Sequence, residues 1–163
     1  MQNAIAKKID TVCFTGHREI DNADAVNIPT RLKALIVNLI SRGATKFRAG
    51  GARGFDTIAA LCILELKADG YPQIELELKL PCRDQTKRWN ENDCKVYNYI
   101  MSQASSVEYV IDHYTSWCMH ERNRRLVSGS DVCIAYLKNS KGGTASTYAL
   151  ALSKGLEVIN IAE

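Results

Sequence analysis

Residues 10–18 read DTVCFTGHR, a short apolar segment that runs into a threonine, a glycine and two basic side chains. The apolar run predicts a buried β-strand over residues 10–14, because it is short and contains β-branched and aromatic side chains. Gly16 predicts a tight turn directly after this strand. A strand that ends in such a turn and leads into a helix is the first half of a βαβ unit, the repeating element of parallel sheets.

The segment that follows predicts this helix. Residues 22–27 are polar and are interpreted as a connection, and Pro29 fits the first helical turn because its fixed φ is already that of a helix. Apolar side chains then recur at the spacing of one helical face from Leu32 to Ile40, and Gly43 ends the helix.

The same alternation continues to the end of the chain. Further strands are predicted at residues 45–49, 74–80, 107–111, 132–137 and 158–161. Further helices are predicted at residues 56–69, 85–104 and 117–127, with a last helix that ends at Gly155. This pattern predicts an α/β fold, a Rossmann-like, doubly wound and mainly parallel sheet flanked by helices.

Two of these strands predict their own places in the sheet. Residues 74–80 alternate between apolar and charged side chains, which favours an edge strand with one side in water. Residues 132–137 are apolar throughout, which favours a central strand.

Length and composition limit what this chain can be. Its 163 residues suit one domain, residues 1–163, and 46% hydrophobic with 24% charged residues is ordinary globular composition. The net charge of +3 is too small to favour duplex nucleic acid or a membrane surface as partner. The longest apolar run, residues 58–64, is too short to cross a bilayer, and residues 1–10 lack the apolar core of a signal peptide. We therefore expect a cytoplasmic protein.

The cysteines and histidines predict no metal site. The six cysteines include no Cys-x-x-Cys pair, and several lie within apolar strand or helix patterns, so they are interpreted as reduced and mostly buried thiols. His17, His113 and His120 share no metal-ligand spacing.

Three connections carry glycine at the carboxyl ends of predicted strands. These ends meet at one edge of a parallel sheet, where ligands bind. Each connection brings backbone N–H groups near the start of a helix, where unpaired donors and the helix dipole attract anions. The residues are Thr15, Gly16, His17 and Arg18 in the first connection, Gly50, Gly51, Arg53 and Gly54 in the second, and Gly142, Gly143 and Thr144 in the third. Together they predict a phosphate-binding cradle, although each glycine alone could simply serve a tight turn.

Side chains beside these connections leave alternatives open. Arg18 and Arg53 could bind phosphate or carboxylate oxygens, or could only solubilise the surface. Asp56 could cap the following helix or accept a ligand hydroxyl. Trp89 is interpreted as helix core rather than as a platform for a base. Neither a Walker pattern nor a G-x-G-x-x-G after the first strand is present, which disfavours nucleoside-triphosphate hydrolysis and ordinary NAD-linked dehydrogenation.

The order of these motifs resembles the SLOG superfamily of Rossmann-like nucleotide-binding proteins. Within it, the chain is most similar to the YpsA-like branch, a domain of unknown function. The resemblance rests on residues 13–18 (CFTGHR), residues 50–56 (GGARGFD), Pro81 with Gln85 and Trp89, Arg122 with Asn123, and residues 142–144 (GGT). It implies that the strand-end loops hold a nucleotide-derived ligand related to ADP-ribose, and it adds Arg122 and Asn123 to the ligand-binding residues.

The resemblance also raises the question of catalysis. LOG-type phosphoribohydrolases of this superfamily cut the N-glycosidic bond of modified adenosine monophosphates, and residues 119–122 (MHER) are similar to one of their signatures. This similarity implies that Arg122 and Glu121 are the catalytic candidates. The second signature of these enzymes has a catalytic Glu where this chain has Thr147. Because a neutral hydroxyl cannot replace that carboxylate, the resemblance favours binding over hydrolysis.

We therefore predict a protein that binds a phosphorylated, nucleotide-derived small molecule and senses or sequesters it. A role in capturing a nucleotide immune signal, in bacteria or their phages, is compatible with this prediction. The alternatives are a nucleotide N-glycosidase and a single-stranded DNA binder of the DprA type, with a basic face that includes Arg122, Arg124 and Arg125. The modest net charge makes nucleic acid the less favoured partner. Self-association is expected from related folds, although no interface is evident in the sequence.

Overall fold

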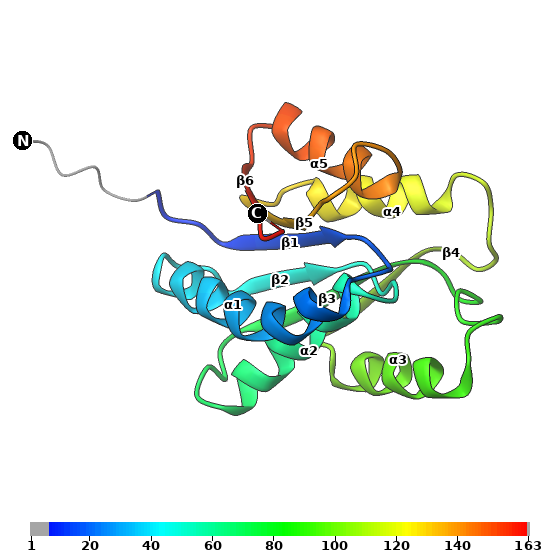
Figure 1. The fold of residues 1–163 in the computed structure, drawn as a ribbon, viewed down its shortest axis with the longest axis horizontal. Coiled ribbons are helices and arrows are strands. Elements are labelled where there is room, and N and C mark those ends of the chain that lie inside the picture. Colours follow the sequence, from blue (N-terminus) through cyan, green and yellow to red (C-terminus); the bar gives the residue numbers. More distant parts are fainter. Residues whose placement is uncertain (1–6, 163) are drawn as a thin grey trace, which may run out of the picture.

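Strands and helices alternate through the chain (Figure 1). The structure is a computed structural model that describes residues 7–162, so the prediction about a signal peptide at residues 1–10 lies mostly outside the described residues. The strands are β1 (Thr11–Gly16), β2 (Lys46–Ala49), β3 (Glu75–Cys82), β4 (Ser106–Ile111), β5 (Val132–Tyr136) and β6 (Glu157–Asn160). The helices are α1 (Asn22–Ser41), α2 (Phe55–Ala68), α3 (Glu91–Gln103), α4 (Cys118–Val127) and α5 (Gly143–Ser153).

The strands form one sheet in the order β4-β3-β2-β1-β5-β6, and all five pairings are parallel. The chain builds outward from β1 to β4 and then returns to the other side of β1 to add β5 and β6. The direction of winding therefore reverses between β1 and β5. In open parallel sheets, such a reversal leaves a crevice at the carboxyl ends of the two strands. The predicted doubly wound α/β fold is confirmed, and so is the interior position of β5.

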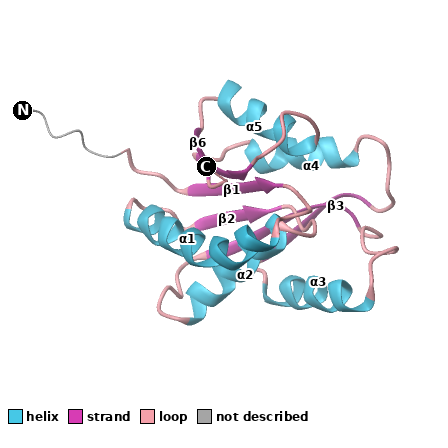
Figure 2. Ribbon diagram, viewed as in Figure 1, coloured by secondary structure: helices cyan, strands magenta, loops and turns pink. Residues whose placement is uncertain are grey.

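Helices cover both faces of the sheet, with α1, α2 and α3 on one side and α4 and α5 on the other (Figure 2). β1 contributes to both sides. Its Val12 and Phe14 belong to the larger core under α1 and α2, whereas Cys13 belongs to a smaller cluster with Leu126 and Ala151 of α4 and α5. Because both faces of β1 are covered, the strand is buried at every position but Gly16.

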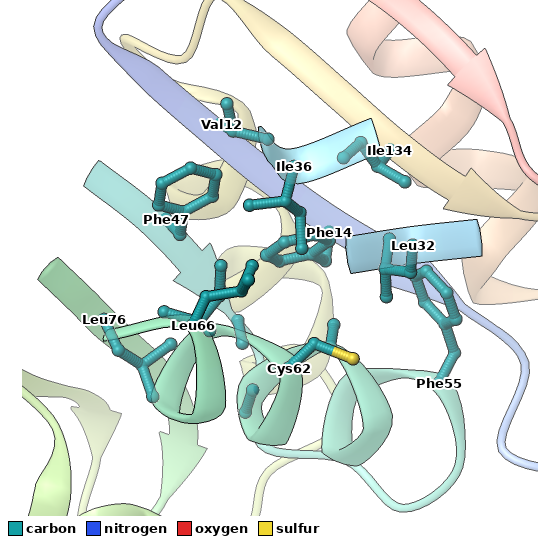
Figure 3. Close-up of a cluster of buried hydrophobic side chains, with 14 of the residues drawn as sticks. Val12, Phe14, Leu32, Ile36, Phe47, Phe55, Cys62, Leu66, Leu76 and Ile134 are labelled. Atoms are coloured by element: carbon teal, nitrogen blue, oxygen red, sulfur yellow. The ribbon is translucent and has the colours of Figure 1, made fainter. Parts of the chain in front are cut away.

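The larger core fixes where β1 ends and α2 begins (Figure 3). The ring of Phe14 lies 6.3 Å from the ring of Phe47 on β2 and 6.3 Å from the ring of Phe55 at the start of α2. Phe55 also stacks on Tyr136 at the end of β5, with 5.9 Å between ring centroids. These buried rings hold the ends of three strands and the start of one helix together at the edge where ligands are expected.

The prediction of an edge strand for residues 74–80 is wrong, because β3 lies between β2 and β4. Its charged side chains pair with neighbouring strands. Arg48 Nε donates to Glu77 Oε1 at 3.1 Å, and Lys79 Nζ donates to Glu108 Oε2 at 2.7 Å. Helix α4 packs over the same strand. Paired charges on an interior strand thus produce the same alternation as a solvated edge.

Two predicted helix starts are also wrong. Helix α1 begins at Asn22 and contains Pro29 in its interior, because the polar residues before Pro29 form the solvent-exposed first turns of the helix and not a connection. Helix α3 begins at Glu91 and not at residue 85, because Asn90 caps it by accepting the Asp93 N–H at 2.8 Å. Trp89 therefore lies in the turn before α3 and not within a helix.

Five of the six cysteines are buried and Cys94 is partly buried, which confirms that most of the thiols lie inside the protein. Cys13 and Cys133 lie opposite each other on β1 and β5. Within residues 7–162, no helix is both long enough and apolar enough to span a membrane.

Candidate ligand-binding site

A cavity of about 640 Å³ opens where β1 and β5 end, at the reversal of the strand order. Its walls come from the ends of these two strands and the residues that follow them, from Ala52 and the start of α2, from α4 and from the first turn of α5. The polar residues and glycines that line it are Thr15, Gly16, His17, Arg18, Glu19, Asp21, Asp56, Arg122, Asn123, Lys138, Asn139, Gly143 and Thr144. We call this cavity the switch crevice.

The switch crevice brings together most of the predicted binding residues. The first connection contributes Thr15, Gly16, His17 and Arg18, the third contributes Gly143 and Thr144, and Asp56, Arg122 and Asn123 complete the set. Five predicted residues do not line it: Gly50, Gly51, Arg53, Gly54 and Gly142. The first and third connections therefore supply most of the loop residues of the crevice, whereas the second contributes Ala52 but none of its glycines.

The first turn of α5 faces the switch crevice without a side-chain cap. Gly142 occupies the N-cap position with φ of 97°, a backbone conformation that side chains disfavour, and the first turn contains no acidic residue. Gly143 and Thr144 line the cavity. The hydroxyl of Thr147 donates to Gly143 O at 2.9 Å, one turn back in the same helix. The positive end of this helix dipole is thus presented to the cavity, an arrangement that favours anions.

His17 orders the loop that leads to α5. Its Nε2 accepts hydrogen bonds from the backbone N–H groups of Lys138, at 2.9 Å, and Asn139, at 3.3 Å. Its own backbone N–H donates to Tyr136 O at 3.3 Å. The first connection therefore positions the third, which the sequence pattern did not indicate.

Lys138 is a cation of the crevice that sequence reasoning missed. Its Nζ lies 2.8 Å from Asp21 Oδ2 and 2.5 Å from Asp24 Oδ2, and Tyr136 Oη donates to Asp24 at 2.5 Å. These hydrogen bonds, with that of Asp21 the strongest, raise the pKa of Lys138 well above its ordinary value. The only available signal was a lysine directly after the fifth strand.

The second connection is closed by Arg122 and Asp56. Arg122 is 5% exposed, and its guanidinium donates to Gly50 O and, through Nε, to Asn123 Oδ1 at 2.7 Å. Asp56 is 5% exposed and accepts the Ala52 N–H at 3.2 Å. Burial raises the pKa of Asp56, and the positive charge of Arg122 partly offsets that rise. Burial likewise lowers the pKa of Arg122, which the Asp56 carboxylate opposes.

Asp56 does not cap α2, which answers one alternative left open by the sequence. Gly54 occupies the N-cap position, with no side-chain cap, and the Phe55 N–H donates to His17 O at 3.1 Å. Gly54 has φ of 80°, and a Cβ there would lie 2.2 Å from the backbone oxygen of Arg18. The second and first connections are thus packed backbone against backbone, and only glycine fits between them.

Glu121, Arg124 and Arg125 are not among the residues that line the switch crevice. Arg124 and Arg125 both donate to the Glu121 carboxylate, and Arg125 also donates to Glu108 at 2.8 Å. The Arg124 hydrogen bond, followed by that of Arg125, lowers the pKa of Glu121 to about 2. Arg122 turns inward. Arg122, Arg124 and Arg125 therefore do not form the predicted basic face. Arg122 is buried, and the other two are paired with carboxylates.

The fold and the crevice define a Rossmann-like α/β protein with an anion-suited cavity where its strand order reverses. A family model, YpsA, described as the YspA SLOG family, matches residues 12–158. The chain belongs to this family, as the sequence resemblance predicted.

Relatives and solved structures agree with this assignment. The chain is 27% identical to a UPF0398 protein of Brevibacillus brevis, over 78% of this chain and 69% of that protein. It is 26% identical to the uncharacterized SPbeta prophage-derived protein YoqJ of Bacillus subtilis, over 76% of this chain and 79% of that protein. DNA processing protein A from Helicobacter pylori, described for its single-stranded DNA binding mode, has a similar fold, with a TM-score of 0.68 and 23% identity over 93% of this chain. The chain spans 64% of the length of that structure.

Proposed function

We propose that this protein binds a phosphorylated, nucleotide-derived small molecule in the switch crevice and acts by sensing or sequestering it. The observation that carries this proposal is the uncapped start of α5, whose Gly143 and Thr144 line the same cavity as Arg18. A phosphate placed there would accept hydrogen bonds from backbone N–H groups at the start of the helix. It would also accept charge-assisted hydrogen bonds from the guanidinium of Arg18. ADP-ribose is the reference ligand.

The remaining predicted residues have supporting roles in this proposal. Thr15 and Gly16 at the end of β1 and Asn123 on α4 line the same cavity and are proposed as further ligand contacts. Arg122 and Asp56 hold the second connection in place, so that Gly50, Gly51 and Gly54 shape the wall without contacting the ligand.

Two residues bear on whether the ligand is hydrolysed: Thr147, at the position of the LOG-type catalytic Glu, and Glu121. Their positions in the structure favour binding without hydrolysis. The Thr147 hydroxyl is buried and bonded to its own helix, and the Glu121 carboxylate is held by two arginines outside the crevice. No general acid or base role is therefore proposed for either residue.

Single-stranded DNA is the competing ligand, because the DNA processing protein A of Helicobacter pylori, which has a similar fold, is described as binding it. That likeness weakens the expectation that nucleic acid is not a partner. The pairing of Arg124 and Arg125 with carboxylates favours the small molecule. An oligonucleotide therefore belongs in the same experiment.

The experiment is calorimetry and thermal unfolding of the wild-type chain with ADP-ribose, AMP, NAD and a single-stranded oligonucleotide. Binding should raise the unfolding free energy by ~2.7 kcal/mol at a ligand concentration one hundred times Kd. Thr144→Asp should reduce the affinity for ADP-ribose at least ~10-fold by repelling the phosphate, while leaving α5 stable, because an acidic residue suits the first helical turn. Thr144→Ser is the matched control and should bind as the wild type does. The proposal is wrong if no nucleotide binds, or if only the oligonucleotide does.

A further inference from the structure

A second cavity, of about 620 Å³, adjoins the switch crevice. The two share Arg18, Ala52 and Met119 in their linings, so these residues lie at the boundary between the cavities. The second cavity is built by the end of β3, by the turn before α3, and by Tyr114 in the loop after β4. We call it the side cavity.

Trp89 gives the side cavity an aromatic wall. It is partly buried, its ring meets that of Tyr97 edge to face at 5.4 Å, and the Arg53 guanidinium lies 5.1 Å from its centroid. Arg53 is itself 43% exposed in its side chain and lies 3.9 Å from Asp93. A planar heterocycle can stack on such a guanidinium or replace it on the indole, because both surfaces favour π systems.

Gln85 supplies a polar group with nothing to bind. Its Oε1 is buried and has no hydrogen-bond partner among residues 7–162, and Gln85 belongs to the wall of the side cavity. A buried amide oxygen without a donor is destabilising. Rotation of the Gln85 side chain toward the side cavity would let this oxygen accept a hydrogen bond from a ligand N–H group. Two other buried unpartnered oxygens, of Tyr97 and Thr115, belong to segments that flank this cavity.

We propose that the side cavity holds the heterocyclic base of the same ligand whose phosphate binds in the switch crevice. This inference rests on the proposed function and adds a ligand class to it: a nucleoside diphosphate ester, with two phosphates passing Arg18 and a base with an exocyclic or ring N–H between Trp89 and Gln85. Arg18 is then the contact that links the two cavities. The Gln85 oxygen accepts a hydrogen bond from the base and so selects for a base with an N–H group. Trp89 and Arg53 supply the surface on which the base stacks.

Fluorescence can separate the two cavities. The chain has two tryptophans, so Trp117→Phe, outside both cavities, leaves Trp89 as the single reporter. ADP-ribose should change the emission of Trp89, whereas ribose 5-phosphate should bind with measurable heat and leave the emission unchanged. Gln85→Met should lower the affinity for ADP-ribose ~10-fold, leave that for ribose 5-phosphate unchanged, and maintain or raise Tm, because it removes an unpartnered oxygen. Gln103→Met, on the exposed end of α3, is the control.

The outcomes distinguish this inference from the function beneath it. If ADP-ribose binds but neither changes Trp89 emission nor responds to Gln85→Met, the side cavity does not hold the base, and the phosphate site stands. If neither ADP-ribose nor ribose 5-phosphate binds, the proposed function itself fails, and the inference fails with it.

Discussion

Two glycine-rich connections that look equivalent in the sequence differ in the structure. Residues 50–54 are closed: the guanidinium of Arg122 and the carboxylate of Asp56 bond to their backbone. Residues 138–144 are open. The His17 side chain accepts hydrogen bonds from the backbone at Lys138 and Asn139, but no side chain caps the helix start to which the segment leads. Glycine serves close packing in the first and access in the second. The fate of the backbone N–H groups, and not the number of glycines, decides which connection can bind an anion.

Substituting one glycine in each connection should give the largest contrast. Gly54→Ala is expected to lower the free energy of unfolding by ~4 kcal/mol, because backbone strain adds to a collision with the Arg18 backbone. Gly142→Ala has comparable strain but meets no atom within 4 Å, so a loss of ~1–2 kcal/mol is expected. Denaturant unfolding of both variants measures the difference. Equal losses would mean that the two connections are equally open.

Arg122→Met should remove the hydrogen bond to Gly50 O that helps to hold residues 50–54 closed. It leaves the Asp56 carboxylate buried without a cation, for which we expect a loss of ~3 kcal/mol in unfolding free energy at neutral pH. Arg124→Met, two positions along α4 in an exposed pair, is the control and should have little effect.

The pH dependence of the Arg122→Met variant identifies the cause. The pKa of Asp56 is raised in the folded protein, so its contribution to stability is complete below its ordinary pKa of 3.8 and is lost as pH rises through the folded value. Without Arg122 this pKa should rise further, so the variant should regain stability relative to the wild type as pH falls. Adding Asp56→Asn should restore much of the loss at neutral pH. A variant whose deficit is the same at every pH would contradict this explanation.

The smallest expected effect lies outside both connections. Arg124 and then Arg125 lower the pKa of Glu121 to about 2, so this carboxylate stabilises the fold above its ordinary pKa of 4.5, and the stabilisation disappears as pH falls toward 2. Glu121→Gln should remove this part of the acid dependence, measured by thermal unfolding across that range. Nucleotide affinity should be unchanged. Release of free base from a nucleoside monophosphate by the wild type, and its loss in this variant, would support the N-glycosidase alternative instead.

Most of the fold could be predicted because it depends on patterns that are local in the sequence. Alternating strand and helix signals require parallel pairing, and the apolar run of residues 132–137 required an interior strand. The position of β3 could not be predicted, because Arg48 and Glu108 neutralise its charges from other strands. A charge partner on a distant segment leaves no trace in a strand's own periodicity.

Only part of the site could be predicted, because only some of its residues belong to patterns that are local in the sequence. Gly16 and Arg18 at the end of β1 and Gly143 at the start of α5 belong to local signals, and they meet in the switch crevice. The bond of His17 to the backbone of Lys138 joins segments 121 positions apart, so neither the ordering role of His17 nor the place of Lys138 was visible. Trp89 and Gln85 were noticed as motif residues, but their common cavity depends on where α3 begins.

The most direct test is an NMR titration of the ¹⁵N-labelled chain with ADP-ribose. We predict that the backbone amides of Gly143 and Thr144 show the largest chemical-shift changes, while those of Gly50 and Gly54, which line neither the switch crevice nor the side cavity, change much less. Large changes at Gly50 and Gly54 with none at the start of α5, or no change at any amide at saturating ligand, would contradict this prediction.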